Sequence, residues 1–365
     1  GHLDSKDVAV HAAYVNRLLH DGYEVVGASR WLNAVVVKTF ADPSFLAKLD
    51  FVRKVEAVKK LQGGLAEIPL STESLDYGSA QQQIELLNGH LLHEAGFTGA
   101  GMRIAVLDAG FANAMILEAF DSLYAENRMV DAYDFVHNDT NVYDGGGGHG
   151  TSVLSTMAAL NSGVMTGVAP HAEYALYTTE DVSSETRQEE YNWVFGSERA
   201  DSLGCDIINT SLGYYEMDDP NESYTYEDMD GNTTVITRAA DIAASRGLIV
   251  AASAGNTGFS SWQRIVAPCD GDSVFCVGGT NLNGVYVAFS GRGPSADGRV
   301  KPNVVGAAAG VTVLTGSDVP TAGNGTSFSS PVMAGLLACV WQKFPFKNNV
   351  EVMQAVELIS DQQYA

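Results

Sequence analysis

The chain has 365 residues, of which 45% are hydrophobic and 18% are charged, a composition typical of globular proteins with a sizeable buried core. Its formal net charge is −23, and an acidic protein of this kind lacks the Lys and Arg clusters that bind nucleic acid. The sequence also contains no uncharged apolar run of about 18 residues, so we expect no membrane-spanning helix.

The first part of the chain mixes helical and strand-like patterns. In chain order we predict a helix over 7–20, strands over 23–32 and 34–40, a helix over 43–49 and a strand over 51–58. This order of elements fits a small α+β domain of the ferredoxin-like type, with one sheet and two helices on a face. We place this domain at residues 1–62.

Residues 63–80 contain paired Gly, a Pro, several Ser and scattered acids without a sustained period, which is typical of a linker. Over 81–365 the pattern changes to apolar strands that alternate with helical stretches. We predict strands over 103–107, 172–177, 206–209 and 248–252, and helices over 151–160, 189–203, 234–245 and 327–343. Such alternation predicts an α/β domain built on a doubly wound parallel sheet that is covered on both faces.

Three residues of this second domain could carry chemistry together. Asp108 follows the strand over 103–107, His149 lies between glycines at the start of a helical stretch, and Ser327 begins an apolar helix. Pro331 in that helix fits its first turn, where the N–H groups have no intrahelical partner. Taken singly, each of the three is an ordinary turn, loop or N-cap residue. Together they supply a nucleophilic hydroxyl, a general base and a carboxylate that orients the base.

Five segments around these residues carry a family resemblance. In this order, RIAVLDAGF, GGHGTSVLSTMAA, INTSLG, VAASAGN and NGTSFSSPVMAG resemble the hallmark blocks of the subtilases, the subtilisin-like serine proteases. The resemblance implies a subtilisin-like fold and a serine endopeptidase in which Ser327 is the nucleophile, His149 the general acid/base and Asp108 its orienting carboxylate. It also implies that Asn256 supplies an oxyanion-hole amide beside the Ser327 N–H. An esterase of the α/β-hydrolase kind does not fit, because G-x-S-x-G is absent and the triad order differs.

The same resemblance implies where a protein or peptide substrate binds. Ser211, Leu212 and Gly213 resemble the segment that pairs with an extended peptide through main-chain hydrogen bonds. Ala252, Ser253, Ala254 and Gly255 would form the opposite wall of the pocket for the residue before the cleaved bond. Because all of these residues are small or apolar, we expect a pocket without a fixed charge and a preference for apolar or medium side chains.

Residues 6–62 are similar to the prodomains that chaperone and inhibit subtilases, notably in GYEVVGASRWLNAVVVKTF and LDFVRKVEAV. The resemblance implies an intramolecular inhibitor whose tail after Val58 lies in the active-site cleft, self-cleavage between Lys60 and Ala80, and a secreted or periplasmic protein. Residues 1–62 hold nine Lys/Arg and seven Asp/Glu, a net charge of +2, so the other residues hold 12 and 37, a net charge of −25. This asymmetry fits electrostatically assisted docking, and solvation of an acidic surface is the alternative.

A catalytically silent or locked homologue that binds peptides is the competing hypothesis for the whole chain. The intact set of Asp108, His149, Ser327 and Asn256 favours the enzyme. Two departures from the family pattern bear on the site. Ala109 follows Asp108 where Thr or Ser is usual, which removes a hydroxyl near the triad, and Tyr214 replaces a glycine that commonly follows Ser-Leu-Gly, which would close the rim of the cleft.

The sequence requires no cofactor for this chemistry. Asp228, Asp230 and Asn232 resemble the start of a calcium loop but lack the distal Glu, so a solvated loop is the alternative to a calcium site. Of the four cysteines, Cys269 and Cys276 could form a disulfide in an oxidising compartment, or stay reduced. Cys205 and Cys339 lie in apolar runs and are expected to be buried packing residues.

Overall fold

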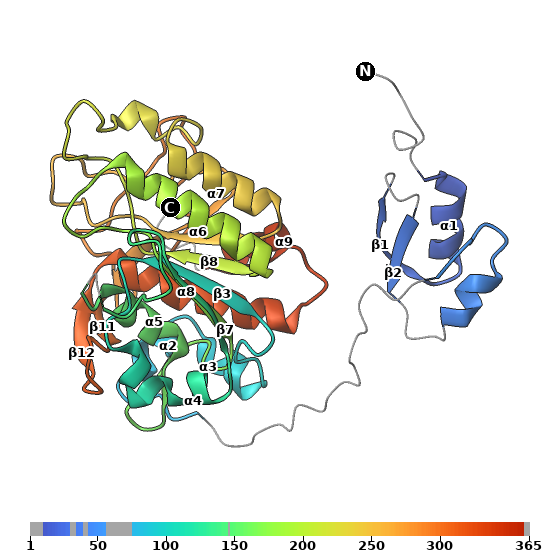
Figure 1. Cartoon of the computed structure of the whole chain (residues 1–365), viewed down its shortest axis with the longest axis horizontal. Coiled ribbons are helices and arrows are strands. Elements are labelled where there is room, and N and C mark those ends of the chain that lie inside the picture. The colour runs from blue at the N-terminus through green and yellow to red at the C-terminus, as the bar shows by residue number, and fades with distance from the viewer. Residues whose placement is uncertain (1–9, 30–33, 39–42, 56–74, 145–146, 361–365) are drawn as a thin grey trace. The chain divides into compact units, whose positions relative to one another are not determined.

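A computed structural model describes residues 10–29, 34–38, 43–55, 75–144 and 147–360. The chain divides into two compact units, Gly1–Pro69 and Leu70–Ala365 (Figure 1). The division falls within residues 63–80, the segment that we predict to be a linker.

The first unit contains a helix packed on a two-stranded antiparallel sheet. Its described elements are α1 (Ala12–His20), β1 (Glu24–Ser29), β2 (Ala34–Lys38) and the 3₁₀ helix η2 (Pro43–Lys48). The strand predicted over 51–58 is wrong for residues 51–55, which form no strand, and 56–58 lie outside the described residues. The Val52 N–H donates to Leu49 O at 3.0 Å in a turn, and the Phe51 ring stacks on Tyr14 with centroids 4.6 Å apart. These contacts hold the chain in a turn against α1.

The second unit is built on an eight-stranded sheet with the order β12-β11-β10-β9-β8-β3-β7-β4. All neighbouring strands are parallel except β11 and β12, which are antiparallel. The strands are β3 (Arg103–Asp108), β4 (Met129–Asp134), β7 (Glu173–Thr178), β8 (Ile207–Thr210), β9 (Ile249–Ser253), β10 (Val274–Asn281), β11 (Val304–Val313) and β12 (Thr321–Asn324). The predicted α/β fold with a largely parallel sheet is confirmed.

Helices cover both faces of this sheet, as Figure 1 shows. The α-helices are α2 (Gln81–Glu85), α3 (Gly89–Glu94), α4 (Asp121–Ala125), α5 (His149–Ala158), α6 (Arg187–Leu203), α7 (Val235–Ser245), α8 (Thr326–Lys343) and α9 (Asn349–Ile359). The short elements are η3 (Ala114–Ile116), η4 (Glu118–Phe120), η5 (Tyr226–Asp228) and the hairpin of β5 (Leu160–Asn161) and β6 (Met165–Thr166). No helix in these ranges is both long and apolar enough to cross a membrane.

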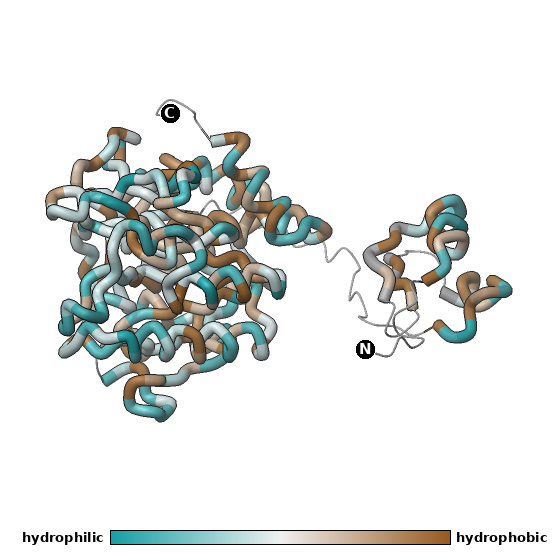
Figure 2. The backbone as a smooth tube through the Cα atoms, turned by 90° about the horizontal axis from the view of Figure 1, so that it is seen from above, coloured by the Kyte–Doolittle hydropathy of each residue, from teal (hydrophilic) through white to brown (hydrophobic). Residues whose placement is uncertain are grey.

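The alternation of side chains along each strand divides the core into two layers. On β3, Ile104 and Val106 join the cluster under α5 and α8, whereas Ala105 and Leu107 join the cluster under α6 and α7. In Figure 2 brown, hydrophobic stretches run through the middle of this unit, and much of the teal, hydrophilic colour lies on its outer loops. Helix α8 is buried along most of its length, which fixes the position of its N-terminus against the sheet.

Candidate active site

The carboxyl ends of three neighbouring strands bring the predicted residues to one edge of the sheet. The register pairs Leu107 of β3 with Thr210 of β8, and Thr210 with Ala252 of β9. The next residue on each strand therefore lies at the same edge, and Asp108 and Ser211 are two of these residues. In open α/β sheets this edge is where ligands bind.

Asp108 and His149 form a hydrogen-bonded pair at this edge. The Asp108 side chain is fully buried, and its Oδ1 accepts from His149 Nδ1 at 2.7 Å and from the Ala109 N–H at 2.8 Å. The Asp108 carboxylate raises the pKa of His149, against an opposing effect of burial. Gly150 allows α5 to begin here, because a Cβ at this position would lie 2.4 Å from Gly110 O. The pair thus has the geometry of a carboxylate that orients an imidazole.

The second carboxylate oxygen of Asp108 differs from the first. Its Oδ2 is buried and has no hydrogen-bond partner among the described residues. The residue beside it, Ala109, has no hydroxyl to donate, in agreement with the departure noted from the sequence. Within the part of the chain that the structure describes, the hydrogen bonds to this carboxylate therefore all go to the oxygen that faces His149.

Ser327 lies in the first turn of α8 and is tied to Ser211. The helix begins at Thr326, so Pro331 is not in its first turn, as the sequence suggested, but in the second. Pro331 has no N–H to donate to the carbonyl four residues earlier, which is Ser327 O. The Ser211 hydroxyl donates to that oxygen instead, at 2.8 Å.

A buried amide that we did not predict supports this contact. Asn209, the third residue of β8, donates from Nδ2 to Ser211 Oγ at 3.2 Å and accepts from Ser330 Oγ at 2.9 Å. A polar residue in an otherwise apolar strand was the available signal, because a buried amide must find partners. Asn209 therefore joins the end of β8 to the first turns of α8.

The His149 imidazole lies near the first turn of α8, the turn that carries Ser327. The Phe328 ring centroid lies 6.3 Å from that of His149. The Ser327 hydroxyl donates to Ser211 O at 3.4 Å rather than to His149. Catalytic hydrogen bonds are often long or poorly aligned before substrate binds.

Asn256 lies beside the N-terminus of α8 and contacts Thr326, the first residue of that helix. Its Oδ1 accepts from the Thr326 N–H at 2.8 Å and from Thr326 Oγ1 at 3.1 Å, which fixes the orientation of the amide. A Cβ at Gly325 would lie 3.3 Å from Asn256 Nδ2 and 3.8 Å from Ser327 N. Two N–H donors thus border Gly325, and the Ser327 N–H has no intrahelical acceptor. The arrangement suits an oxygen that develops negative charge.

One predicted wall of the substrate pocket, 211–213, directly follows β8. The other, 252–255, begins in the last two residues of β9. Ser211 is buried and Gly213 is exposed, while Leu212 is half-buried between them. In the other wall Ala252, Ser253 and Ala254 are buried and Gly255 is partly exposed. Two main-chain hydrogen bonds join Tyr214 to Ala267, from Tyr214 N to Ala267 O at 3.0 Å and from Ala267 N to Tyr214 O at 3.2 Å.

The expectation that Tyr214 closes the rim of the cleft is wrong. Its side chain is only 1% exposed and packs in the core under α6 and α7. Its hydroxyl donates to Glu180, two residues after β7. Burial raises the pKa of Glu180 to about 8, and the neighbouring Glu185 and Glu189 act in the same direction. The phenol points inward because the partly buried carboxyl group of Glu180 offers it an acceptor.

The residues predicted as a calcium loop are bonded within their own turns. Asp228 accepts from the Thr225 N–H at 2.7 Å, and Asp230 accepts from the N–H groups of Asn232 and Thr233, each at 2.8 Å. Among the described residues, no group of three or more His, Cys, Asp and Glu side chains could hold a metal ion. Calcium binding here stays a prediction.

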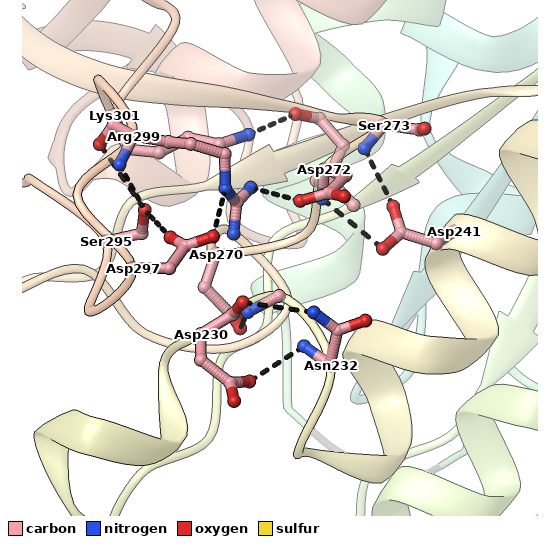
Figure 3. Close-up of polar contacts among 12 residues, drawn as sticks. Asp230, Asn232, Asp241, Asp270, Asp272, Ser273, Ser295, Asp297, Arg299 and Lys301 are labelled. Carbon is pink, nitrogen blue, oxygen red and sulfur yellow. Dashed lines mark hydrogen bonds and ion pairs between the residues drawn. The ribbon is translucent and has the colours of Figure 1, made fainter.

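A cationic side chain lies beside this loop. Figure 3 shows Arg299 between Asp272 and Asp297, with ion pairs of 2.8 Å from Nη1 to Asp272 and 2.7 Å from Nε to Asp297. The buried Asp270 accepts from the Gly231 N–H at 2.9 Å and from Thr237 Oγ1 at 2.7 Å. Arg299 thus supplies positive charge to this group of acids.

Two of the four cysteines form a disulfide, and the other two are free. Cys269 and Cys276 form a disulfide, the oxidised alternative of the two left open by the sequence. Cys205 and Cys339 are free and buried, as predicted.

Comparisons with known proteins agree with this fold. Residues 99–361 match the model of the subtilase family, and residues 1–74 match that of the peptidase S8 propeptide domain of Bacteroidota. Subtilisin E of Bacillus subtilis (strain 168) is 32% identical over 290 residues, which cover 78% of this chain and 66% of that protein. Subtilisin of Bacillus pumilus is also 32% identical over 290 residues, which cover 78% of this chain and 91% of that protein.

Solved structures share the architecture. The crystal structure of a cold adapted subtilisin-like serine proteinase has a TM-score of 0.58 at 21% identity, covering 73% of this chain and 85% of that one. The structure of MycP1 with its N-terminal propeptide removed has a TM-score of 0.57 at 22% identity, covering 75% of this chain and 87% of that one. The chain belongs to the subtilase family, peptidase S8, and carries a peptidase S8 propeptide domain at its N-terminus.

Proposed function

We propose that this protein is a serine endopeptidase that hydrolyses peptide bonds of proteins through an acyl-enzyme and is made as a self-processing zymogen. The observation that carries the proposal is the 2.7 Å hydrogen bond between buried Asp108 and His149, at the same sheet edge as Ser327. A carboxylate, an imidazole and a hydroxyl in this order are the parts of a serine nucleophile with its base.

The chemistry follows from these positions. His149 Nε2 removes the proton from Ser327 Oγ as that oxygen attacks the peptide carbonyl, and a C–O bond forms. Asn256 Nδ2 and the Ser327 N–H stabilise the oxyanion. The C–N bond then breaks, and His149 gives its proton to the leaving amine. Water, with His149 again as the base, then attacks the carbonyl of the ester. The C–O bond to Ser327 Oγ breaks, the peptide leaves with a new carboxyl group, and His149 returns the proton to Ser327.

Binding of the substrate rests on the two walls. The exposed main chain at Gly213 and the partly exposed Gly255 are suited to pair with an extended peptide. Such pairing reads the backbone and therefore tolerates many sequences. No cofactor takes part in the proposed steps, and calcium would serve only to stabilise the loop at Asp228, Asp230 and Asn232.

The propeptide domain is proposed to inhibit the enzyme until the chain is cut between Lys60 and Ala80. Most of that interval, residues 60–74, lies outside the described residues, as does the tail after Val58 that would occupy the cleft. The disulfide between Cys269 and Cys276 supports the secreted or periplasmic location, because disulfides persist in oxidising compartments.

A silent homologue that binds peptides without cleaving them is the second candidate. The hydrogen bond from Ser327 Oγ to Ser211 O, at 3.4 Å, favours it, since this hydroxyl is not engaged with its base. The enzyme is preferred because Asn256 Nδ2 and the Ser327 N–H both border Gly325, an arrangement that peptide binding alone does not need.

Labelling separates these two candidates. The purified chain is treated with a serine-directed phosphonate, digested and mapped by mass spectrometry, beside Ser327→Ala. An active enzyme carries the label on Ser327 and cleaves an unfolded protein, and Ser327→Ala does neither. A silent homologue takes up no label and cleaves nothing, although it still binds peptides.

A further inference from the structure

Asp108 and Thr178 are neighbours across two parallel strands. The register pairs Asp108, the last residue of β3, with Thr178, the last residue of β7, and Figure 1 shows the two strands side by side. Residues paired in this way carry their side chains on the same face of a sheet. Tyr174 and Leu176 of β7 join the core cluster under α5 and α8. Thr178, two residues further on, faces the same side, as Asp108 does.

Each of these two side chains has a buried polar atom that needs a partner. Asp108 Oδ2 is an acceptor and Thr178 Oγ1 is a donor, and neither has a hydrogen-bond partner among the described residues. Asp108 is fully buried and Thr178 is 4% exposed. Buried polar atoms without partners are rare and costly in folded proteins. Because neighbouring strands lie about 4.8 Å apart, one water molecule between the side chains can accept from the hydroxyl and donate to the carboxylate.

Asp134, on the far side of Thr178, does not need this hydroxyl. It lies on β4 and is paired with Thr178 in the sheet. Both of its carboxylate oxygens already accept hydrogen bonds. Oδ1 accepts from the Val136 and His137 N–H groups at 2.8 and 2.9 Å, and Oδ2 accepts from His137 Nδ1 at 3.0 Å. The Thr178 hydroxyl is thus left for the carboxylate on its other side.

Two other positions next to Asp108 supply no donor to its Oδ2. Ala109 follows it in the chain and has no hydroxyl. On β8, the strand on its other side, Ser211 continues the same row, and its hydroxyl donates to Ser327 O at 2.8 Å. In the part of the chain that the structure describes, the Thr178 hydroxyl is therefore the neighbouring donor that remains for Asp108 Oδ2.

We propose that Thr178 is a positioning residue of the catalytic site and that its hydroxyl holds Asp108 Oδ2 through one buried water. This inference rests on the proposed endopeptidase function and adds to it a residue outside the triad. With Oδ1 bonded to His149 and Oδ2 to the water, both ends of the carboxylate are fixed, and with them the orientation of the imidazole. The Thr178 hydroxyl thus compensates for the one that Ala109 lacks.

The test compares two threonines that are alike in burial. Thr179 is fully buried, and its hydroxyl also has no partner among the described residues. Its side chain lies on the opposite face, where a Cβ at Gly196 of α6 would be 3.3 Å from its methyl group. Thr178→Val, Thr178→Ser and Thr179→Val are prepared beside wild type. Active enzyme is counted by phosphonate titration, and kcat and KM are measured with one peptide p-nitroanilide.

We expect Thr178→Val to lower kcat at least about tenfold while KM stays within about twofold, because a misplaced base slows the chemical step without weakening substrate binding. Thr178→Ser keeps the hydroxyl and should retain kcat to within about threefold. Thr179→Val should retain it equally well, because its hydroxyl lies on the other face of the sheet.

The inference is overturned if Thr178→Val keeps kcat to within about twofold, or if Thr179→Val loses as much as Thr178→Val does. If Thr178→Val does not fold, a high-resolution crystal structure of Ser327→Ala decides. We expect one water within hydrogen-bond distance of both Asp108 Oδ2 and Thr178 Oγ1, and the absence of such a water overturns the inference.

The same measurements separate this inference from the proposed function. A chain that takes no phosphonate label and cleaves no peptide refutes the proposed function itself. A chain that is labelled, cleaves the peptide and tolerates Thr178→Val refutes only the role of Thr178.

Discussion

The Ser211 hydroxyl takes the place of a missing backbone donor at Ser327. Pro331 cannot donate to Ser327 O, and Ser211 Oγ does so at 2.8 Å. The side chain of a residue that we propose to line the substrate pocket thus helps to hold the turn that carries Ser327, the proposed nucleophile.

Ser211→Ala should destabilise the protein, because it leaves a helical carbonyl oxygen without its donor. We expect a loss of about 1 to 3 kcal/mol in the free energy of unfolding, measured by chemical denaturation in the Ser327→Ala background to prevent self-digestion. Ser211→Thr keeps the hydroxyl and serves as the control. Equal stability of Ser327→Ala with and without the Ser211→Ala change would show that the contact contributes nothing.

Asp108→Asn should reduce kcat by about 10⁴, because an amide favours the wrong tautomer of His149. The general base must be neutral, so activity rises with pH through the pKa of His149. Asp108 raises that pKa above the ordinary 6.5, so the acidic limb of the wild-type kcat/KM profile should have its midpoint above pH 6.5. The residual activity of Asp108→Asn should have its midpoint at lower pH, and an unmoved midpoint would contradict the assigned pair.

Asn256→Asp should abolish most activity and leave the fold intact. The variant keeps an oxygen for the Thr326 N–H but loses the Nδ2 donor. Removing such a donor costs about 10² to 10³ in kcat, a magnitude measured in a subtilisin. Steady-state kinetics with a peptide substrate and thermal unfolding are both needed, and a variant that retains wild-type kcat would exclude Asn256 from the oxyanion site.

Glu180→Gln should flatten the dependence of stability on pH. The pKa of Glu180 is about 8 in the folded protein, against an ordinary 4.5. Between these values the folded state holds a proton that the unfolded state has lost, so the contribution of Glu180 to stability is greatest below pH 4.5 and falls as pH rises towards 8. Glu180 contributes at most about 1.4 kcal/mol per pH unit to this slope.

The measurement is thermal or chemical unfolding of Ser327→Ala and its Glu180→Gln derivative from pH 5 to 8. Glu185→Gln is the comparison, because burial raises the pKa of Glu185 to about 7 and its contribution ends at lower pH. Identical slopes with and without Glu180 would mean that this carboxyl group is ionised throughout.

The sequence predicted those parts of the fold that carry strong local signals. The strands predicted over 103–107, 172–177, 206–209 and 248–252 have apolar residues at their centres, and all four are strands of the sheet. We did not predict β10 and β11, whose glycines and alanines weaken strand propensity. The packing of β10 against β11 requires these small residues, since a Cβ at Gly279 would lie 2.7 Å from Ala308 Cβ.

The candidate site divides in the same way. Asp108, His149, Ser327 and Asn256 lie in distinctive local segments, which made them visible. The contact of Ser211 with Ser327 and the inward turn of Tyr214 towards Glu180 both join segments that are distant in sequence. Each depends on how the strands and helices pack in the folded domain rather than on a local pattern, so no periodicity or spacing could indicate it.

The central claim is that Ser327 makes this chain a self-processing protease. Purified wild type and Ser327→Ala are incubated side by side, and their intact masses are followed with time. The account predicts that wild type is cut between Lys60 and Ala80 while Ser327→Ala stays full-length. Wild type that remains full-length, or Ser327→Ala that is cut at the same rate, would contradict it.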